Sequence, residues 1–139
     1  MVHALNEIRR VLTSGGYLID LRPFIAKPPV EIISGDKIIP AGFVDDSHDV
    51  PDYLAANDAV EYMTANGLFS HEQSDTFELY TYWDTITEFK TYMDTGTTSI
   101  LPSETLATVE QLLSRLGSTA RIRERLNMTI SRYRKTTPS

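Results

Sequence analysis

The chain contains no cysteine and no long apolar run. The absence of cysteine excludes disulfide bonds and thiolate metal sites, and it favours a protein of the reducing cytoplasm. No apolar stretch approaches the roughly 20 residues of a transmembrane helix, and the first residues lack the basic-then-apolar layout of a signal peptide. We therefore expect a cytoplasmic protein with no membrane partner.

The familiar patterns of nucleotide, nucleophile and metal sites are also missing. The chain has no Gly-x-Gly-x-Gly segment and no phosphate-binding P-loop. It has no nucleophile-elbow pattern and no Ser-His-Asp or Cys-His arrangement that could be proposed. His3 and His71 are isolated in the sequence, so they indicate no metal site.

The length of 139 residues predicts one domain, residues 1–139, with a core of its own. Charge is unevenly spread, because residues 31–110 hold 16 acids and two bases, whereas residues 111–139 hold seven bases and one acid. Such a basic segment is either a nucleic-acid tail or the solvated face of a folded element. The net charge is −6 and the bases alternate with apolar residues, so we favour the solvated face and expect no nucleic-acid partner.

The first 23 residues predict a helix, a turn and a buried strand. Leu5, Ile8 and Leu12 recur at helical spacing, and the Gly15-Gly16 pair allows the chain to leave the helix. Residues 17–21 then form a short, mainly apolar run that ends near Pro23. Such a unit normally lies in the middle of an open α/β sheet, so we expect the first half of the fold to be missing from this chain.

The same segment resembles the helix and fifth strand of class I S-adenosylmethionine-dependent methyltransferases. The family pattern is Glu-x-x-Arg-Val-Leu-Lys-Pro-Gly-Gly, and the residues that match it are Glu7, Arg10, Val11, Leu12, Gly15 and Gly16. Thr13 and Ser14 stand where the family has Lys and Pro, two positions that only shape the turn. The family's cofactor-binding segments would precede this one. The resemblance therefore implies a substrate-side half that does not bind S-adenosylmethionine alone.

The remaining elements follow from periodicity, turns and caps. They are a hairpin of residues 30–33 and 37–44 with Pro40 on an edge, a helix from Asp49 to Gly67, an aromatic strand at 77–83, a helix from the Thr85-Glu88 capping box to Gly96, a helix ending at Gly117 and an alternating strand from Arg121. The resemblance implies that the last strand inserts between the other two, antiparallel to both. The predicted fold class is α/β, a partial Rossmann-like methyltransferase sheet with flanking helices and a β-hairpin insertion.

In that arrangement one sheet edge collects the ends of the strands at 17–21 and 77–83 and the start of the last strand. Ligands of open α/β sheets bind at such an edge. The candidate substrate-binding residues there are Asp20, Arg22, Trp83, Asp84 and Arg121. The hairpin and the loop at 45–49 are candidates for a cover over this edge.

Each candidate also has a structural interpretation. Trp83 forms either a substrate cage or sheet packing, and Arg22 is either an anion clamp or a surface charge. Asp20 is either a base or the partner of a loop amide. The loop residues Asp45, Asp46, His48 and Asp49 carry metal-ligand atoms, but ligands so close in sequence usually form a solvated, helix-capping loop, which we favour.

Two functions remain after these exclusions. The first is the substrate-side half of an S-adenosylmethionine-dependent methyltransferase, inactive as an isolated chain, with a small-molecule substrate. The second is a non-catalytic ligand-binding or dimeric interaction module derived from that fold. The strand at residues 17–21 would lack its neighbour in the family, and natural proteins rarely leave such an edge open. We therefore expect a homodimer through Tyr17 to Leu21.

Overall fold

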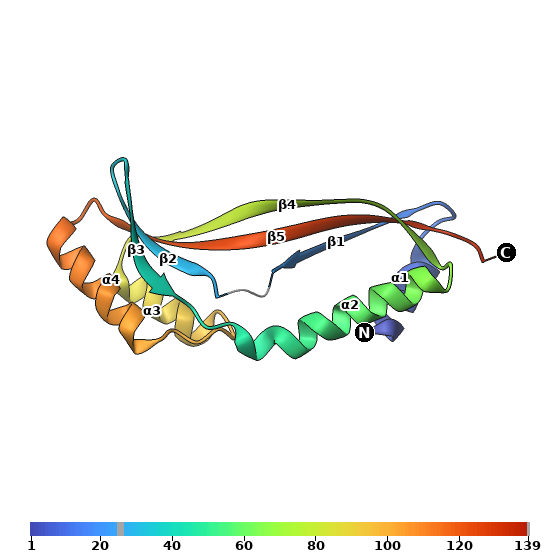
Figure 1. The fold of residues 1–139 in the computed structure, drawn as a ribbon, viewed down its shortest axis with the longest axis horizontal. Helices are drawn as coiled ribbons and strands as arrows, with labels where there is room; N and C mark the ends of the chain where they lie inside the picture. Colours follow the sequence, from blue (N-terminus) through green and yellow to red (C-terminus); the bar gives the residue numbers. More distant parts are fainter. Residues whose placement is uncertain (25–26, 139) are drawn as a thin grey trace. The chain divides into compact units, whose positions relative to one another are not determined.

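The computed structural model of the chain describes residues 1–24 and 27–138 (Figure 1). In chain order the elements are α1 Val2–Val11, β1 Tyr17–Pro23, β2 Pro29–Ser34, β3 Lys37–Phe43, the 3-10 helix η1 Ser47–Asp49, α2 Val50–Ala65, β4 Phe69–Trp83, α3 Ile86–Thr95, α4 Ser103–Leu116 and β5 Arg121–Lys135. The strands form an open antiparallel sheet, so the chain is an α/β protein. None of the described helices is both long and apolar enough to span a membrane.

β5 is the strand that joins the others. Its residues 128–134 pair antiparallel with β1, its residues 121–124 pair antiparallel with β2, and β4 also pairs with it. β5 therefore lies between β1 and β4, as predicted for the last strand. The hairpin of β2 and β3 extends this sheet, because β2 pairs directly with β5. Pro40 lies in β3, which among the described strands pairs only with β2, as predicted.

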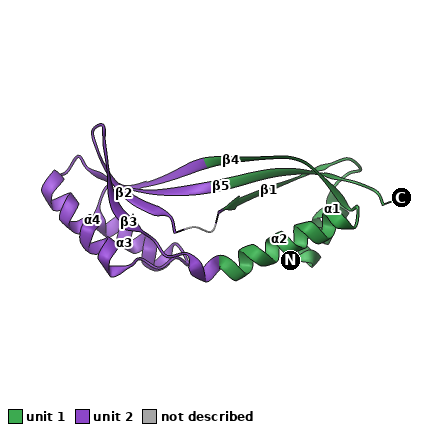
Figure 2. Cartoon of the chain, viewed as in Figure 1, with its two compact units in different colours: residues 1–23, 50–77, 128–139 green, residues 24–49, 78–127 purple. Residues whose placement is uncertain are grey.

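The chain divides into two compact units, coloured separately in Figure 2. Unit 1 comprises residues 1–23, 50–77 and 128–139, and unit 2 comprises residues 24–49 and 78–127. β4 and β5 each supply residues to both units. Each unit has an apolar core of its own.

The core of unit 1 is built on the predicted stripe of α1. Leu5 is buried, and Ile8 and Leu12 pack against the same cluster. The other buried members of this core are Ala59, Met63, Phe69 and Tyr133. Gly15, in the turn before β1, has a φ of +70°, a conformation that residues with a Cβ adopt only with strain. The predicted helix and turn are confirmed, and a strand follows them. It is not the buried, central strand that was predicted, because its residues alternate between exposed and half-buried and it pairs, among the described strands, only with β5.

The core of unit 2 packs α3 and α4 against the hairpin and the first part of β5. Its members with no exposed surface are Val30, Ile32, Val44, Phe89, Val109 and Ile122. The predicted capping box is present, because the Glu88 N–H donates to Thr85 Oγ1 at 3.1 Å and the Thr85 N–H donates to the Glu88 carboxylate at 3.2 Å. Both helices end before the predicted glycines, Gly96 and Gly117.

One strand is longer than predicted. β4 begins at Phe69, whereas the aromatic alternation predicted a strand only from Phe77. The residues between them are polar and exposed on both faces. An exposed strand shows no apolar alternation, so its backbone pairing with β5 leaves no trace in the hydrophobic pattern.

Candidate functional site

The α2-facing side of β1 carries charged residues. The register places Leu18 opposite Tyr133, Asp20 opposite Ser131 and Arg22 opposite Thr129. Leu18 and Tyr133 pack with residues of α2 in the core of unit 1. Because alternate residues of a strand point to the same face, Asp20 and Arg22 lie on this side as well.

Asp20 and Arg22 form a two-point ion pair. Arg22 Nε donates to Asp20 Oδ1 at 2.9 Å, and Nη2 donates to Oδ2 at 2.7 Å. The guanidinium also lies 5.3 Å from the centre of the Tyr53 ring, a cation–π contact. The partner of Asp20 is thus a guanidinium, in place of the loop amide that was one of the two predicted alternatives. Arg22 Nη1 and Thr129 Oγ1 are buried atoms with no hydrogen-bond partner among the described residues.

Removing Arg22 should destabilise the protein measurably. The paired side chains are only 25% and 17% exposed, so Arg22→Ala leaves a partly buried carboxylate uncompensated. We expect a loss of about 1 to 2 kcal/mol in unfolding free energy, between the values for exposed and buried pairs. Urea denaturation followed by circular dichroism measures this loss. The control is Arg10→Ala, because the Arg10–Glu7 pair on α1 is exposed; equal effects of the two changes would contradict the interpretation.

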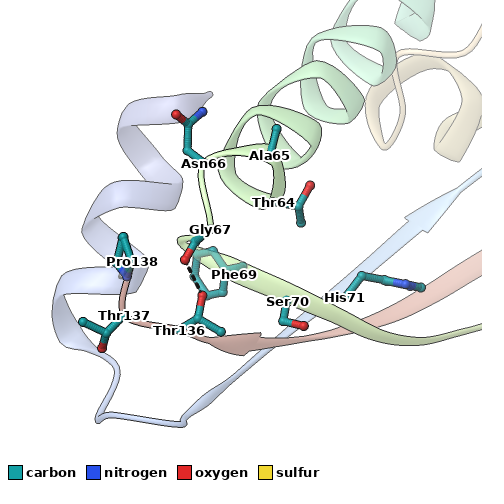
Figure 3. Close-up of a pocket in the computed structure, with 10 residues that line it drawn as sticks. All are labelled: Thr64, Ala65, Asn66, Gly67, Phe69, Ser70, His71, Thr136, Thr137 and Pro138. Atoms are coloured by element: carbon teal, nitrogen blue, oxygen red, sulfur yellow. Dashed lines mark hydrogen bonds between the residues drawn. The ribbon is translucent and has the colours of Figure 1, made fainter.

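A cavity of about 350 Å³ opens beside this ion pair. It is lined by Arg22, Asn57, Val60, Glu61, Thr64, His71 and Tyr133. Pockets for small molecules occupy roughly 300 to 1,000 Å³, so a compact ligand would fit. A second hollow of about 640 Å³ shares Thr64 and His71 with the first and is shown in Figure 3.

His71 connects the cavity to a chain of polar groups. Its ring lies 5.1 Å from the Tyr133 ring, and its Nε2 shares a hydrogen bond of 2.7 Å with Ser74 Oγ. Ser74 Oγ shares a further hydrogen bond of 2.7 Å with Ser131 Oγ, and Ser131 lies opposite Asp20. An imidazole in such a place can donate a hydrogen bond to a polar ligand or accept one from it. No sequence pattern indicates this chain of polar groups, because Ser74 and Ser131 are 57 residues apart.

The other three predicted site residues belong to unit 2. Trp83 is 8% exposed, and its ring lies 5.0 Å from the Phe89 ring and 5.1 Å from the Tyr92 ring. These contacts favour sheet packing over a substrate cage. Arg121 Nε donates to Asp84 Oδ1 at 2.6 Å. The structure thus brings together Asp20 with Arg22 and Asp84 with Arg121, and a site formed by all five residues stays a prediction.

The arginines of β5 are engaged in ion pairs. Arg123 donates two hydrogen bonds to Glu31, of 2.8 and 2.6 Å, and Arg125 lies 3.2 Å from the same carboxylate. In unit 1, Arg132 and Arg134 both pair with Glu72, at 3.0 and 2.5 Å. Charges balanced in this way favour the interpretation of the basic segment as a folded, solvated face.

Unit 2 also buries two carboxyl groups that the sequence analysis did not single out as a pair. Glu124 is 5% exposed and Asp46 is 7% exposed. Burial, and then the charge of Asp46, raises the pKa of Glu124 to about 7. Burial also raises the pKa of Asp46. Glu124 occupies an even position of the alternating segment, the phase of the buried Ile122, so the alternation did contain a signal for its burial.

The other acids of the loop at 45–49 serve the local structure. The hydroxyl and the backbone N–H of Ser47 donate to Asp45 and hold the pKa of that carboxyl below its ordinary value. Asp49 accepts a hydrogen bond of 2.9 Å from Thr98 Oγ1. Within residues 1–24 and 27–138, no three His, Cys, Asp or Glu side chains are grouped so that they could hold a metal ion.

Comparisons of the chain with protein-family models, with curated proteins and with solved structures found no match.

Proposed function

We propose that this chain is the substrate-side part of a class I S-adenosylmethionine-dependent methyltransferase. The observation that carries the proposal is the strand order, in which β5 pairs with both β1 and β4 in an antiparallel sheet. The resemblance in the first 23 residues implied this order for the last three strands. Its matched positions lie on α1 and in the turn before β1, where Gly15 adopts a positive φ.

In this proposal the chain positions the methyl acceptor. Methyl transfer is a displacement in which the acceptor atom must lie in line with the methyl group and in which water must be kept away. The proposed substrate-binding residues are Asp20 and Arg22 in unit 1 and Asp84 and Arg121 in unit 2. Trp83 is left out of this proposal because its ring packs against Phe89 and Tyr92. S-adenosylmethionine, when bound to a complete protein of this family, supplies the methyl group.

The chain of 139 residues should not bind S-adenosylmethionine. The family's contacts with the adenosine, ribose and methionine groups lie in segments that would precede Met1, and absent groups contribute no binding energy. Isothermal titration calorimetry of S-adenosylmethionine into the chain should give only the heat of dilution. A dissociation constant in the low micromolar range would contradict this prediction.

The methyltransferase proposal itself is tested on a longer polypeptide. We expect the coding sequence upstream of the Met1 codon to encode, in frame, a strand followed by a glycine-rich loop. The polypeptide that includes this segment should bind S-adenosylmethionine in the same calorimetric experiment. An upstream sequence without such a segment, or a longer polypeptide that does not bind, would overturn the proposal.

The second candidate function is a ligand-binding module, and the cavity beside His71 favours it. The cavity brings a carboxylate, an amide and an imidazole, from Glu61, Asn57 and His71, to one space in unit 1. Convergent polar groups in a pocket of this size are typical of sites for small polar molecules. This function needs no segment upstream of Met1.

A further inference from the structure

One edge of β1 is unpaired among the described strands. Two backbone hydrogen bonds, one just before and one just after the strand, show which of its residues point toward that edge. The Lys135 N–H donates to the Gly16 carbonyl at 2.8 Å, and the Phe24 N–H donates to the Asn127 carbonyl at 2.7 Å. Hydrogen-bonded pairs alternate along antiparallel strands, so the even residues of β1 exchange their bonds with β5. The N–H and C=O groups of Tyr17, Ile19 and Leu21 therefore point away from β5. Among the described strands, β1 pairs with β5 alone.

The side chains of the same three residues are apolar and half exposed. Tyr17 is 45% exposed, Ile19 is 53% exposed and Leu21 is 52% exposed. Natural edge strands are usually protected by a lysine, a proline or a bulge. The register between β1 and β5 runs without a shift, and the proline comes only at Pro23. Within β1 the charge of Asp20 is balanced by Arg22. Arg132 and Arg134, which lie over the Tyr17 ring, both pair with Glu72.

We infer that β1 of one chain pairs antiparallel with β1 of a second copy, about a two-fold axis at Ile19. In this register Ile19 faces its own copy and Tyr17 faces Leu21 of the second chain. Every outward N–H and C=O of the three residues then finds a partner. Their side chains form one continuous apolar stripe, because directly opposite residues lie on the same face.

One competing register has its axis at Asp20. It would place the two Asp20 carboxylates directly opposite each other, and like charges in that position are destabilising. It would also place Pro23, which has no N–H, opposite Tyr17, so that hydrogen bonds would be lost. Charge and hydrogen bonding therefore both favour the axis at Ile19.

The interface should be weak. A standard interface buries about 800 Å² per partner, and one strand edge with three half-exposed side chains is smaller. We expect dissociation in the micromolar range, where chains associate at the concentrations of a scattering experiment. The inference concerns the 139-residue chain, because the family's neighbouring strand would fill the same edge of β1 in a longer polypeptide. It depends on neither cofactor nor substrate, so its failure is distinct from a failure of the methyltransferase proposal.

Cysteine cross-linking tests the register, and no native thiol can interfere because the chain has no cysteine. Ile19→Cys should form an intermolecular disulfide under mild oxidation, since opposite Cα atoms lie about 5.5 Å apart in a hydrogen-bonded pair. Leu21→Cys alone should not, because four residues of strand separate the two sulfurs by about 13 Å. A mixture of Tyr17→Cys and Leu21→Cys chains should form the mixed disulfide. Cross-linking of Leu21→Cys but not of Ile19→Cys would overturn this register.

Light scattering tests the association itself. The unmodified chain should approach twice its mass of 15.7 kDa as the concentration rises, and Ile19→Lys should remain at the single-chain mass. The matched control is Leu54→Lys, which replaces a residue of α2 that is also 53% exposed and should leave the dimer intact. An unmodified chain that stays at the single-chain mass throughout, or a control that dissociates equally, would overturn the inference. If circular dichroism shows that Ile19→Lys does not fold, the cysteine cross-linking experiment still tests whether β1 pairs with β1 of a second copy.

Discussion

Trp83→Ala is expected to lower the unfolding free energy by about 3 to 5 kcal/mol, the usual cost of removing a large buried aromatic side chain. Trp83 is 8% exposed and packs its ring against Phe89 and Tyr92, both on α3. Alanine would leave these two rings facing a void, so they would lose dispersion contacts as well as burial. Total stabilities of domains are about 5 to 15 kcal/mol, so this single change would remove a large fraction.

The measurement is urea denaturation followed by far-ultraviolet circular dichroism, because the variant lacks the only tryptophan and with it the usual fluorescence signal. Tyr82→Ala is the matched control. Tyr82 is the preceding residue of β4, is 39% exposed and lies under the guanidinium of Arg121 at 4.7 Å. Its loss should cost about 1 kcal/mol or less, the value of an exposed cation–π pair. Equal losses from both changes would show that Trp83 does not anchor the core of unit 2.

The second large effect is a pH dependence that depends on Glu124. Burial raises the pKa of this carboxyl to about 7. A raised pKa in the folded state means that folding favours the protonated form, so the stabilisation is complete below the unfolded pKa of about 4.3 and is lost as the pH rises through 7. At 1.36 kcal/mol per pKa unit, the protein should lose about 3 kcal/mol between pH 5 and pH 8.5.

Glu124→Gln should remove most of this loss, because glutamine is neutral throughout the range. The variant should be close to the unmodified protein at pH 5 and more stable at pH 8.5, as measured by thermal melts at both values. Glu31→Gln is the control, and its expected effect on stability at pH 8.5 is the opposite of that of Glu124→Gln. Glu31 is also buried, but it pairs with Arg123 and Arg125, so its neutralisation should destabilise the protein at pH 8.5. A Glu124→Gln variant that keeps the full pH dependence would assign that dependence to other groups.

The elements that the sequence predicted well are those with local causes. The stripe of α1, the Thr85-Glu88 capping box and the short turn of the predicted hairpin, where Gly35 has a φ of +59°, each act within a few residues. The first part of β4 was missed for a physical reason. Its residues after Phe69 are exposed and polar, and what holds them is the backbone pairing with β5, which a hydrophobic pattern does not record.

The candidate site was less predictable than the fold. The Asp20–Arg22 pair had a local signal, since residues two apart in a strand share a face and these two have opposite charges. The cavity beside His71 had none, because its lining comes from α2 and three separate strands. For Glu124 the sequence contained part of the signal. Glu124 is two residues from the buried Ile122 in the alternating strand, which indicated burial, but only the structure shows that Asp46 lies close enough to raise the pKa of Glu124.

The pairing of β1 with β5 also has a consequence for synthesis on the ribosome. Tyr17 and its partner Arg134 are 117 residues apart, so β1 leaves the ribosome long before its neighbour exists. At about 5 to 20 residues per second, this delay is roughly 6 to 25 s. The β2–β3 hairpin needs no such wait, because its strands are adjacent in the chain. Throughout the delay the apolar residues of β1 are accessible to a chaperone or to a neighbouring nascent chain, and unit 1 closes only when residues 128–134 of β5 have been synthesised.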